Sequence, residues 1–225
     1  GLTVASSLEF KTTRFAASMA GGLTRSNLDQ FVADTQFACD ILVRNLSRAG
    51  ELISSFKQVA VDQTSSQRRQ FDLQEVASEI VLTLSPTIRH CGCAVVTDIS
   101  PNLTLDSYPG PLGQVLSNLI SNAMIHGYSD GQGGLIEVQA RAQGQQEVEL
   151  QVRDHGRGVE RVNLKRIFEP FYTTRLGQGG SGLGLHIVHN IVTGVLGGQI
   201  EVQSTPGEGT VFTLRLPLRA PQATL

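Results

Sequence analysis

The stretch Asn118-Leu119-Ile120-Ser121-Asn122-Ala123-Met124-Ile125-His126 decides how the second half of the chain folds. Asn118, Asn122 and His126 recur every fourth residue, so they share one face of a helix that we expect from Pro111 to about His126. The opposite face is apolar and predicts packing on a core. Amide oxygens on the polar face are ligands that suit Mg²⁺, which takes the rest of its shell from water and nucleotide phosphates. An ordinary surface helix fits the same pattern.

Downstream, two glycine-containing segments have the chemistry of a nucleotide site. In Asp154-His155-Gly156-Arg157-Gly158, a carboxylate follows an expected strand and can accept from an exocyclic amine, while the glycines let backbone approach a flat ring. Gly179-Gly180-Ser181-Gly182-Leu183-Gly184-Leu185 runs into a helix, so its backbone N–H groups and the helix N-terminus suit a polyphosphate. This loop is neither a Walker loop nor a Rossmann fingerprint. A plain turn and a flexible loop are the alternatives.

An aromatic segment lies between them, Phe168-Glu169-Pro170-Phe171-Tyr172-Thr173-Thr174-Arg175. Pro170 stiffens this segment, and the aromatic side chains could anchor a loop. The alternative is a small hydrophobic cluster beneath a loop.

The surrounding elements predict an α+β protein. We expect a helix from Asp72 to Arg89, a strand over 94–99, antiparallel hairpins over 136–153 and 199–216, and a helix over 183–196. Helices interleaved with a mixed, mostly antiparallel sheet predict a two-layer α/β sandwich.

The first part of the chain predicts a helical hairpin. Residues 2–19 form one expected helix, and an apolar heptad over 28–60 indicates a second, with Thr24 as its N-cap. A single hairpin has little core, so we expect a homodimeric four-helix bundle. The expected divisions are 1–62 for the hairpin, 63–70 for a linker, 71–217 for the second domain and 218–225 for a tail.

Composition narrows the function classes. Hydrophobic residues make up 40% and charged residues 17% of the 225, which excludes a disordered chain. A net charge of -2 gives no reason to expect nucleic acid or membrane contact, and three cysteines are no disulfide framework. We therefore expect this part of the protein in the cytoplasm, whether or not its parent is anchored in the inner membrane.

Together, the order and spacing of these motifs resemble the N, G1, F and G2 boxes of the catalytic domain of bacterial sensor histidine kinases. That domain belongs to the GHKL superfamily and has the Bergerat-type ATP-binding fold, and the resemblance covers about residues 71–217. It implies ATP and Mg²⁺ as ligands, with Asn122 on the metal and Asn118 and Asn122 in catalysis. The implied nucleotide contacts are Asn118, Asn122, His126, Asp154, Gly156, Gly158, Thr174, Arg175, Gly180, Ser181, Gly182, Leu183, Gly184 and Thr210.

Two departures from relatives are informative. Ile125 stands where family members often have a phosphate-binding lysine, so His126, Arg175 and the loop amides are expected to neutralise phosphate. Chaperone and gyrase members carry a glutamate where this chain has Asn118, and an amide cannot act as a general base. The resemblance therefore implies a kinase in a two-component system rather than a fast ATPase.

No histidine lies in the expected hairpin, although the family's phosphate acceptor sits there. Gly1-Leu2-Thr3-Val4-Ala5 resembles the residues directly after the acceptor motif, so we expect the acceptor just upstream, and this chain alone is not expected to autophosphorylate. The resemblance implies onward transfer to an aspartate of a response-regulator receiver domain. The alternatives are a degenerate nucleotide-binding dimeric scaffold and an anti-sigma-type serine kinase.

Overall fold

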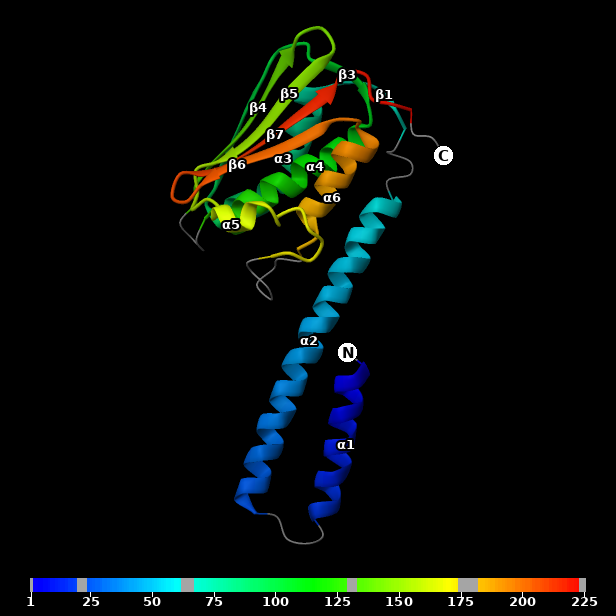
Figure 1. Cartoon of the computed structure of the whole chain (residues 1–225), viewed down its shortest axis with the longest axis vertical. Helices are drawn as coiled ribbons and strands as arrows, with labels where there is room; N and C mark the ends of the chain where they lie inside the picture. The colour runs from blue at the N-terminus through cyan, green and yellow to red at the C-terminus, as the bar shows by residue number, and fades with distance from the viewer. Residues whose placement is uncertain (1, 20–23, 62–66, 129–132, 174–181, 223–225) are drawn as a thin grey trace. The chain divides into compact units, whose positions relative to one another are not determined.

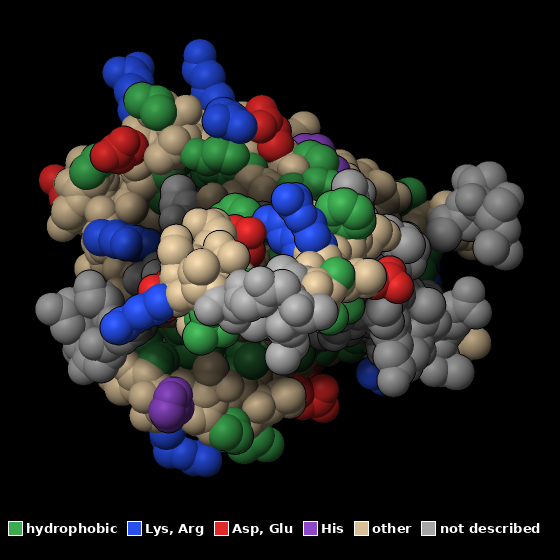
Figure 2. Space-filling model, turned by 90° about the horizontal axis from the view of Figure 1, so that it is seen from below, with side chains coloured by type: hydrophobic (Ala, Val, Ile, Leu, Met, Phe, Trp, Pro, Cys, Tyr) green, Lys and Arg blue, Asp and Glu red, His purple; other side chains and the backbone are tan. Residues whose placement is uncertain are grey.

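The computed structural model describes residues 2–19, 24–61, 67–128, 133–173 and 182–222, without the side chains of residues 2, 3, 18, 19 and 47–61. The chain divides into two compact units, Gly1–Lys57 and Gln58–Leu225 (Figure 1). In the described part of the chain, no helix is both long and apolar enough to cross a membrane. Figure 2 shows Lys and Arg side chains interspersed with Asp and Glu on the face it presents.

The first unit holds the expected helical hairpin, made of helix α1 (Leu2–Met19) and of helix α2 (Arg25–Val61) as far as Lys57. Thr24 caps α2, because its Oγ1 accepts from the backbone N–H of Asn27 at 3.3 Å. The prediction of two helices and of the cap residue is confirmed.

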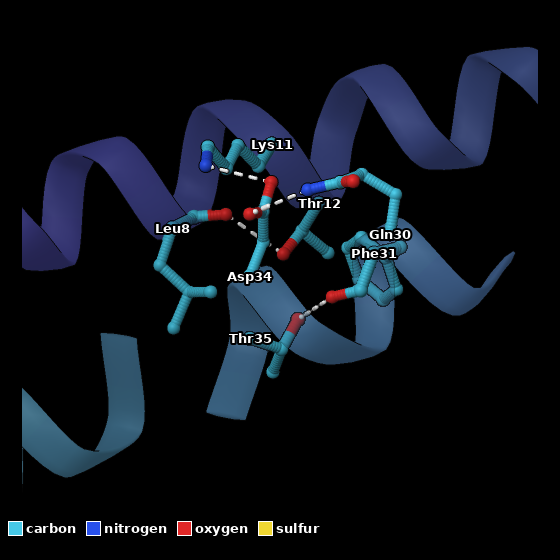
Figure 3. A network of polar contacts seen from close by, with 7 residues as sticks. All are labelled: Leu8, Lys11, Thr12, Gln30, Phe31, Asp34 and Thr35. Atoms are coloured by element: carbon cyan, nitrogen blue, oxygen red, sulfur yellow. Dashed lines mark hydrogen bonds and ion pairs between the residues drawn. The ribbon is translucent and has the colours of Figure 1, made fainter. Parts of the chain in front are cut away.

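An aromatic stack and a polar cluster join the two helices of the hairpin, and Figure 3 shows the polar cluster. The rings of Phe15 and Phe31 stack with centroids 4.0 Å apart. Lys11 Nζ lies 2.8 Å from Asp34 Oδ2, and Gln30 Nε2 donates to Asp34 Oδ1 at 3.1 Å. Exposed pairs of this kind add little stability, so the apolar contacts do most to hold the helices together.

A five-stranded sheet forms one layer of the second unit, in the order β2-β4-β5-β7-β6. Its strands are β2 (Ala94–Ile99), β4 (Leu135–Gln143), β5 (Glu147–Asp154), β6 (Gln199–Thr205) and β7 (Gly209–Pro217). β2 pairs with β4 in parallel, and the other pairs are antiparallel. The expected mixed, mostly antiparallel sheet is confirmed.

Helices α3 (Leu73–Cys91), α4 (Pro109–Asn122) and α6 (Gly184–Asn190) form the second layer (Figure 1). Alternate residues of the strands face them, and Leu150 and Leu214 are fully buried there. The side chains of the core come from both layers: Leu112, Leu116, Leu119, Ile136, Val138, Val148, Leu150, Val188, Val192 and Leu214. The two-layer α/β sandwich is therefore confirmed.

The expected boundaries differ from the structure in two helices. Helix α4 begins at Pro109 rather than Pro111, since Pro109 takes the first-turn position that tolerates a missing N–H. Both α4 and α6 end in a π-helical turn, Ala123–Gly127 and Ile191–Val195. Helix α5 (Arg161–Leu164) was not predicted.

A short antiparallel pair, β1 (Arg69–Asp72) and β3 (Thr104–Ser107), was also missed. The expected linker over 63–70 therefore overlaps β1. Residues 218–221 of the expected tail pack on the domain: Asp106 exchanges backbone hydrogen bonds with Leu218 and Ala220, and Tyr108 Oη donates to the Pro221 carbonyl at 3.1 Å.

Candidate ATP-binding site

Helix α4 and its π-helical turn place the three predicted polar side chains on one wall of a cleft. Asn118, Asn122 and His126 all line it, while Leu119 and Ile120 on the opposite face are buried in the core. The side-chain nitrogen of Asn122 is buried and has no hydrogen-bond partner among the described residues. A buried amide without a protein partner is a group that a ligand can satisfy.

Asp154 ends strand β5 and lines the cleft, and it is one of the few buried polar residues in the described part of the chain, at 6% exposed. Its Oδ1 accepts from the backbone N–H of Gly156 at 3.0 Å. Burial raises the pKa of Asp154, and hydrogen bonds from Gly156 and Thr210 partly oppose that rise. An additional hydrogen-bond donor, such as an amine of a ligand, would stabilise the charged form of this buried carboxyl group.

The turn after Asp154 has no room for side chains at its two glycines. A Cβ on Gly156 would lie 2.1 Å from the carbonyl oxygen of Gly127, and one on Gly158 would lie 2.2 Å from that of Thr205. Gly158 also has a φ of 68°, which favours glycine. The turn after Asp154 therefore packs tightly between the end of the π-helical turn at Gly127 and the β6–β7 hairpin.

Ser204 joins this turn to the β6–β7 hairpin. Its hydroxyl accepts from the backbone N–H of Val159 at 2.8 Å and donates to the Gly209 carbonyl at 2.7 Å. It also lies 3.0 Å from Thr210 Oγ1. Ser204 was not predicted, because a serine in a strand gives no sign of a contact made across the fold.

The glycine-rich loop is described from Gly182 onward. Gly182 has a φ of 70°, and a Cβ there would lie 2.5 Å from the backbone carbon of Phe171. At the start of α6, the backbone of Gly184 faces the two amides, since a Cβ on it would lie 3.7 Å from Asn118 Oδ1 and Asn122 Oδ1. The helix N-terminus and the two asparagines therefore border one space.

The aromatic segment packs beside this loop. Tyr172 Oη donates to Asn163 Oδ1 at 2.6 Å, and the Arg166 guanidinium lies 4.5 Å from the Tyr172 ring centroid. His186 of α6 contacts the Phe168 carbonyl through Nδ1 at 3.1 Å. The segment is held between α5 and α6.

The cleft has a volume of about 540 Å³. It gathers eight of the predicted residues: Asn118, Asn122, His126, Asp154, Gly158, Gly182, Gly184 and Thr210. Gly156 and Leu183 do not line it, since Gly156 packs on Gly127 and the side chain of Leu183 is buried. Thr174, Arg175, Gly180 and Ser181 lie outside the described residues.

Several lining residues were not predicted. Arg157 lies between the two glycines of the turn, and its Nε donates to the His126 carbonyl at 2.6 Å. Glu160, Asn163 and Ile167 come from the segment around α5, for which the sequence pattern predicted no element. Among these residues, only Arg157 could have been found from the sequence, because it lies between two glycines of the predicted site.

Comparisons with known proteins agree with this geometry. The family model of the histidine kinase-, DNA gyrase B- and HSP90-like ATPases matches residues 108–220, half of the chain. The sensor histidine kinase ZraS of Klebsiella oxytoca is 31% identical over 183 residues, 81% of this chain and 38% of ZraS. The alginate biosynthesis sensor protein KinB of Pseudomonas aeruginosa is 32% identical over 218 residues, 93% of this chain and 35% of KinB. The chain thus spans little more than a third of these relatives.

Solved structures show the same fold. The catalytic domain of the histidine kinase ThkA superposes with a TM-score of 0.60 at 27% identity, over 68% of this chain and 97% of that one. Full-length ShkA in complex with AMPPNP shares the fold at 23% identity and a TM-score of 0.60, over 99% of this chain and 46% of that one. The chain belongs to the family of histidine kinase-, DNA gyrase B- and HSP90-like ATPases, and its second unit is an ATP-binding catalytic domain of the sensor histidine kinase kind.

Proposed function

We propose that this chain is the ATP-binding and phosphotransfer part of a two-component sensor histidine kinase. The observation that carries the proposal is that Asp154 and the Asn118–Asn122 pair line one cleft. Asp154 is suited to the adenine amine. The amides facing the start of α6 are suited to a metal-bound triphosphate.

The donor set supports Mg²⁺ beside the two asparagines. Asn118 and Asn122 offer neutral oxygens, and each oxygen lies 3.7 Å from the position that a Cβ on Gly184 would take. When bound, Mg²⁺ neutralises charge on the phosphates. In this chain Asn122 would bind the ion, Asn118 would assist, and the backbone around Gly182 and Gly184 would hold the phosphates.

The cleft favours phosphotransfer over hydrolysis. Position 118 faces Gly184 with an amide, which cannot take a proton from water. The carboxylates that line the described cleft, Asp154 and Glu160, both lie at the end of β5 or beyond it. The transferred phosphoryl group would bond to a histidine nitrogen as its bond to the β,γ-bridging oxygen breaks and ADP leaves.

The acceptor histidine is proposed to lie upstream of Gly1, and the second acceptor to be an aspartate of a receiver domain. The hairpin is proposed to pair with a second copy. Supporting this, the described part of the hairpin exposes large apolar side chains, with Phe37 66% and Leu46 70% exposed. Analytical ultracentrifugation of this chain would find a monomer if the dimer proposal is wrong.

Titration calorimetry with ATP and Mg²⁺ tests the site. Asn122→Ala and Asp154→Asn should each weaken binding at least tenfold, whereas Asn27→Ala on the exposed hairpin surface should not. With the upstream helix restored, label from the γ-phosphate should enter the protein as acid-labile phosphohistidine. Acid-stable phosphoserine would favour a serine kinase, and absence of nucleotide binding by the folded chain would favour a scaffold.

A further inference from the structure

Tyr128 follows the π-helical turn and links two other segments through its hydroxyl. The oxygen accepts from the backbone N–H of His155 at 3.0 Å and donates to the backbone carbonyl of Leu135. Burial raises the pKa of Tyr128, so this hydroxyl stays protonated at neutral pH. One side chain therefore ties the end of the asparagine helix to the start of β4 and to the turn that carries Asp154.

The tyrosine ring occupies space that a glycine leaves open. A Cβ on Gly134 would lie 2.0 Å from Cε1 of Tyr128. Gly134 is not among the glycines with positive φ, so its backbone does not require glycine. The ring and this glycine are matched in shape, which fixes where the hydroxyl lies.

The turn after Asp154 is held from other sides as well. The His155 ring contacts Glu137 Oε2 through Nε2 at 2.8 Å, and Arg157 donates its backbone N–H to the Gly127 carbonyl at 2.8 Å. Without the Tyr128 hydroxyl, the backbone N–H directly after Asp154 would lose its partner. The carboxylate would keep its hydrogen bond from Gly156, but the peptide unit between Asp154 and His155 would lose one of its restraints.

We propose that Tyr128 is a positioning residue that sets the preference of the cleft for a 6-aminopurine over a 6-oxopurine. It does not line the cleft, so it acts through the backbone of His155 on Asp154. The inference rests on the proposed nucleotide site. A carboxylate accepts a hydrogen bond from an amine and repels a carbonyl oxygen, so its placement affects the two base classes differently.

Calorimetry of Tyr128→Phe with ATP and with inosine triphosphate tests this role. The variant keeps the ring against Gly134 and removes only the hydroxyl. We expect ATP to bind about 3- to 10-fold more weakly, with little change for inosine triphosphate, so that the ATP preference falls by the same factor. Tyr108→Phe is the matched control, since its hydroxyl also donates to a backbone carbonyl but lies outside the cleft lining.

An equal loss for both nucleotides, or an unchanged preference in folded Tyr128→Phe, would overturn the inference. Hydrogen exchange of the His155 amide in the nucleotide-free chain gives a second measurement, because that N–H should exchange faster in Tyr128→Phe than in Tyr108→Phe. Wild-type chain that binds neither nucleotide would count against the proposed function, while the exchange result would still decide whether Tyr128 holds the turn.

Discussion

A single methyl group at position 156 should disable the cleft. In Gly156→Ala, the added Cβ would lie 2.1 Å from the oxygen and 2.4 Å from the carbonyl carbon of Gly127. Non-bonded carbon atoms rest about 3.5–4.0 Å apart, so backbone must move by more than about 1 Å. Gly127 is buried at the end of the π-helical turn, so we expect the turn that carries Asp154 to give way.

Gly156→Ala should lower both the stability of the chain and its affinity for ATP. Overpacking of this kind costs about 1–3 kcal/mol of unfolding free energy. Losing a hydrogen bond between the adenine amine and a carboxylate costs about 1.5–3 kcal/mol, so ATP should bind roughly 10- to 100-fold more weakly. Calorimetric titration with Mg²⁺ and ATP, together with thermal unfolding, measures both.

Gly194→Ala is the control for Gly156→Ala. A Cβ on Gly194 meets nothing within 4 Å, and the residue lies in the helical turn after α6 without a positive φ. Alanine there should leave ATP binding unchanged and stabilise the helix by up to about 1 kcal/mol. A folded Gly156→Ala chain that binds ATP as tightly as Gly194→Ala would refute the packing argument.

Three further results are expected. Burial raises the pKa of Asp154, so its charge opposes folding, and the stability of the nucleotide-free wild type should fall as the pH rises from the ordinary carboxyl range through that raised pKa. In calorimetry at several pH values, Asp154→Asn should lack this fall, and its melting temperature at pH 7 should be no lower than that of the wild type. Leu150→Ala, at a fully buried position, should lose about 2–5 kcal/mol in urea unfolding, whereas Leu82→Ala, at a residue 74% exposed, should change it by less than about 0.5 kcal/mol. Arg68 holds the pKa of Asp106 low through paired hydrogen bonds of 2.9 and 2.7 Å, so the carboxyl of Asp106 should titrate at higher pH in Arg68→Ala by NMR; an unchanged titration would show that the pair does not persist in solution.

The sequence predicted the parts of the fold that repeat with a regular period. Alternation over β4 and β5 reflects a buried face, and the four-residue spacing of Asn118 and Asn122 places both on one helix face, so both patterns could be recognised without coordinates. Strands β1 and β3 are four residues each and too short to show such a period. Their pairing depends on contacts between distant parts of the chain.

Eight of the predicted site residues line the cleft, whereas several other lining residues and the residues that support the site were not predicted. Asp154 and Gly158 could be recognised because the chemistry of a nucleotide demands a carboxylate and close backbone. Ser204 and Tyr128 act on backbone groups far away in sequence. Serine and tyrosine make such contacts at many positions, so only the folded arrangement distinguishes these two.

The position of β7 inside the sheet has a consequence for synthesis of the chain. β7 lies between β5 and β6, although it is the last of the five strands to be made. During synthesis, one edge of β5 therefore stays unpaired until β7 has been made, and an unpaired strand edge can pair with other chains. Thr210, the partner of Asp154 across that edge, also arrives late. We therefore expect nucleotide binding to stabilise the domain only after β7 has been made.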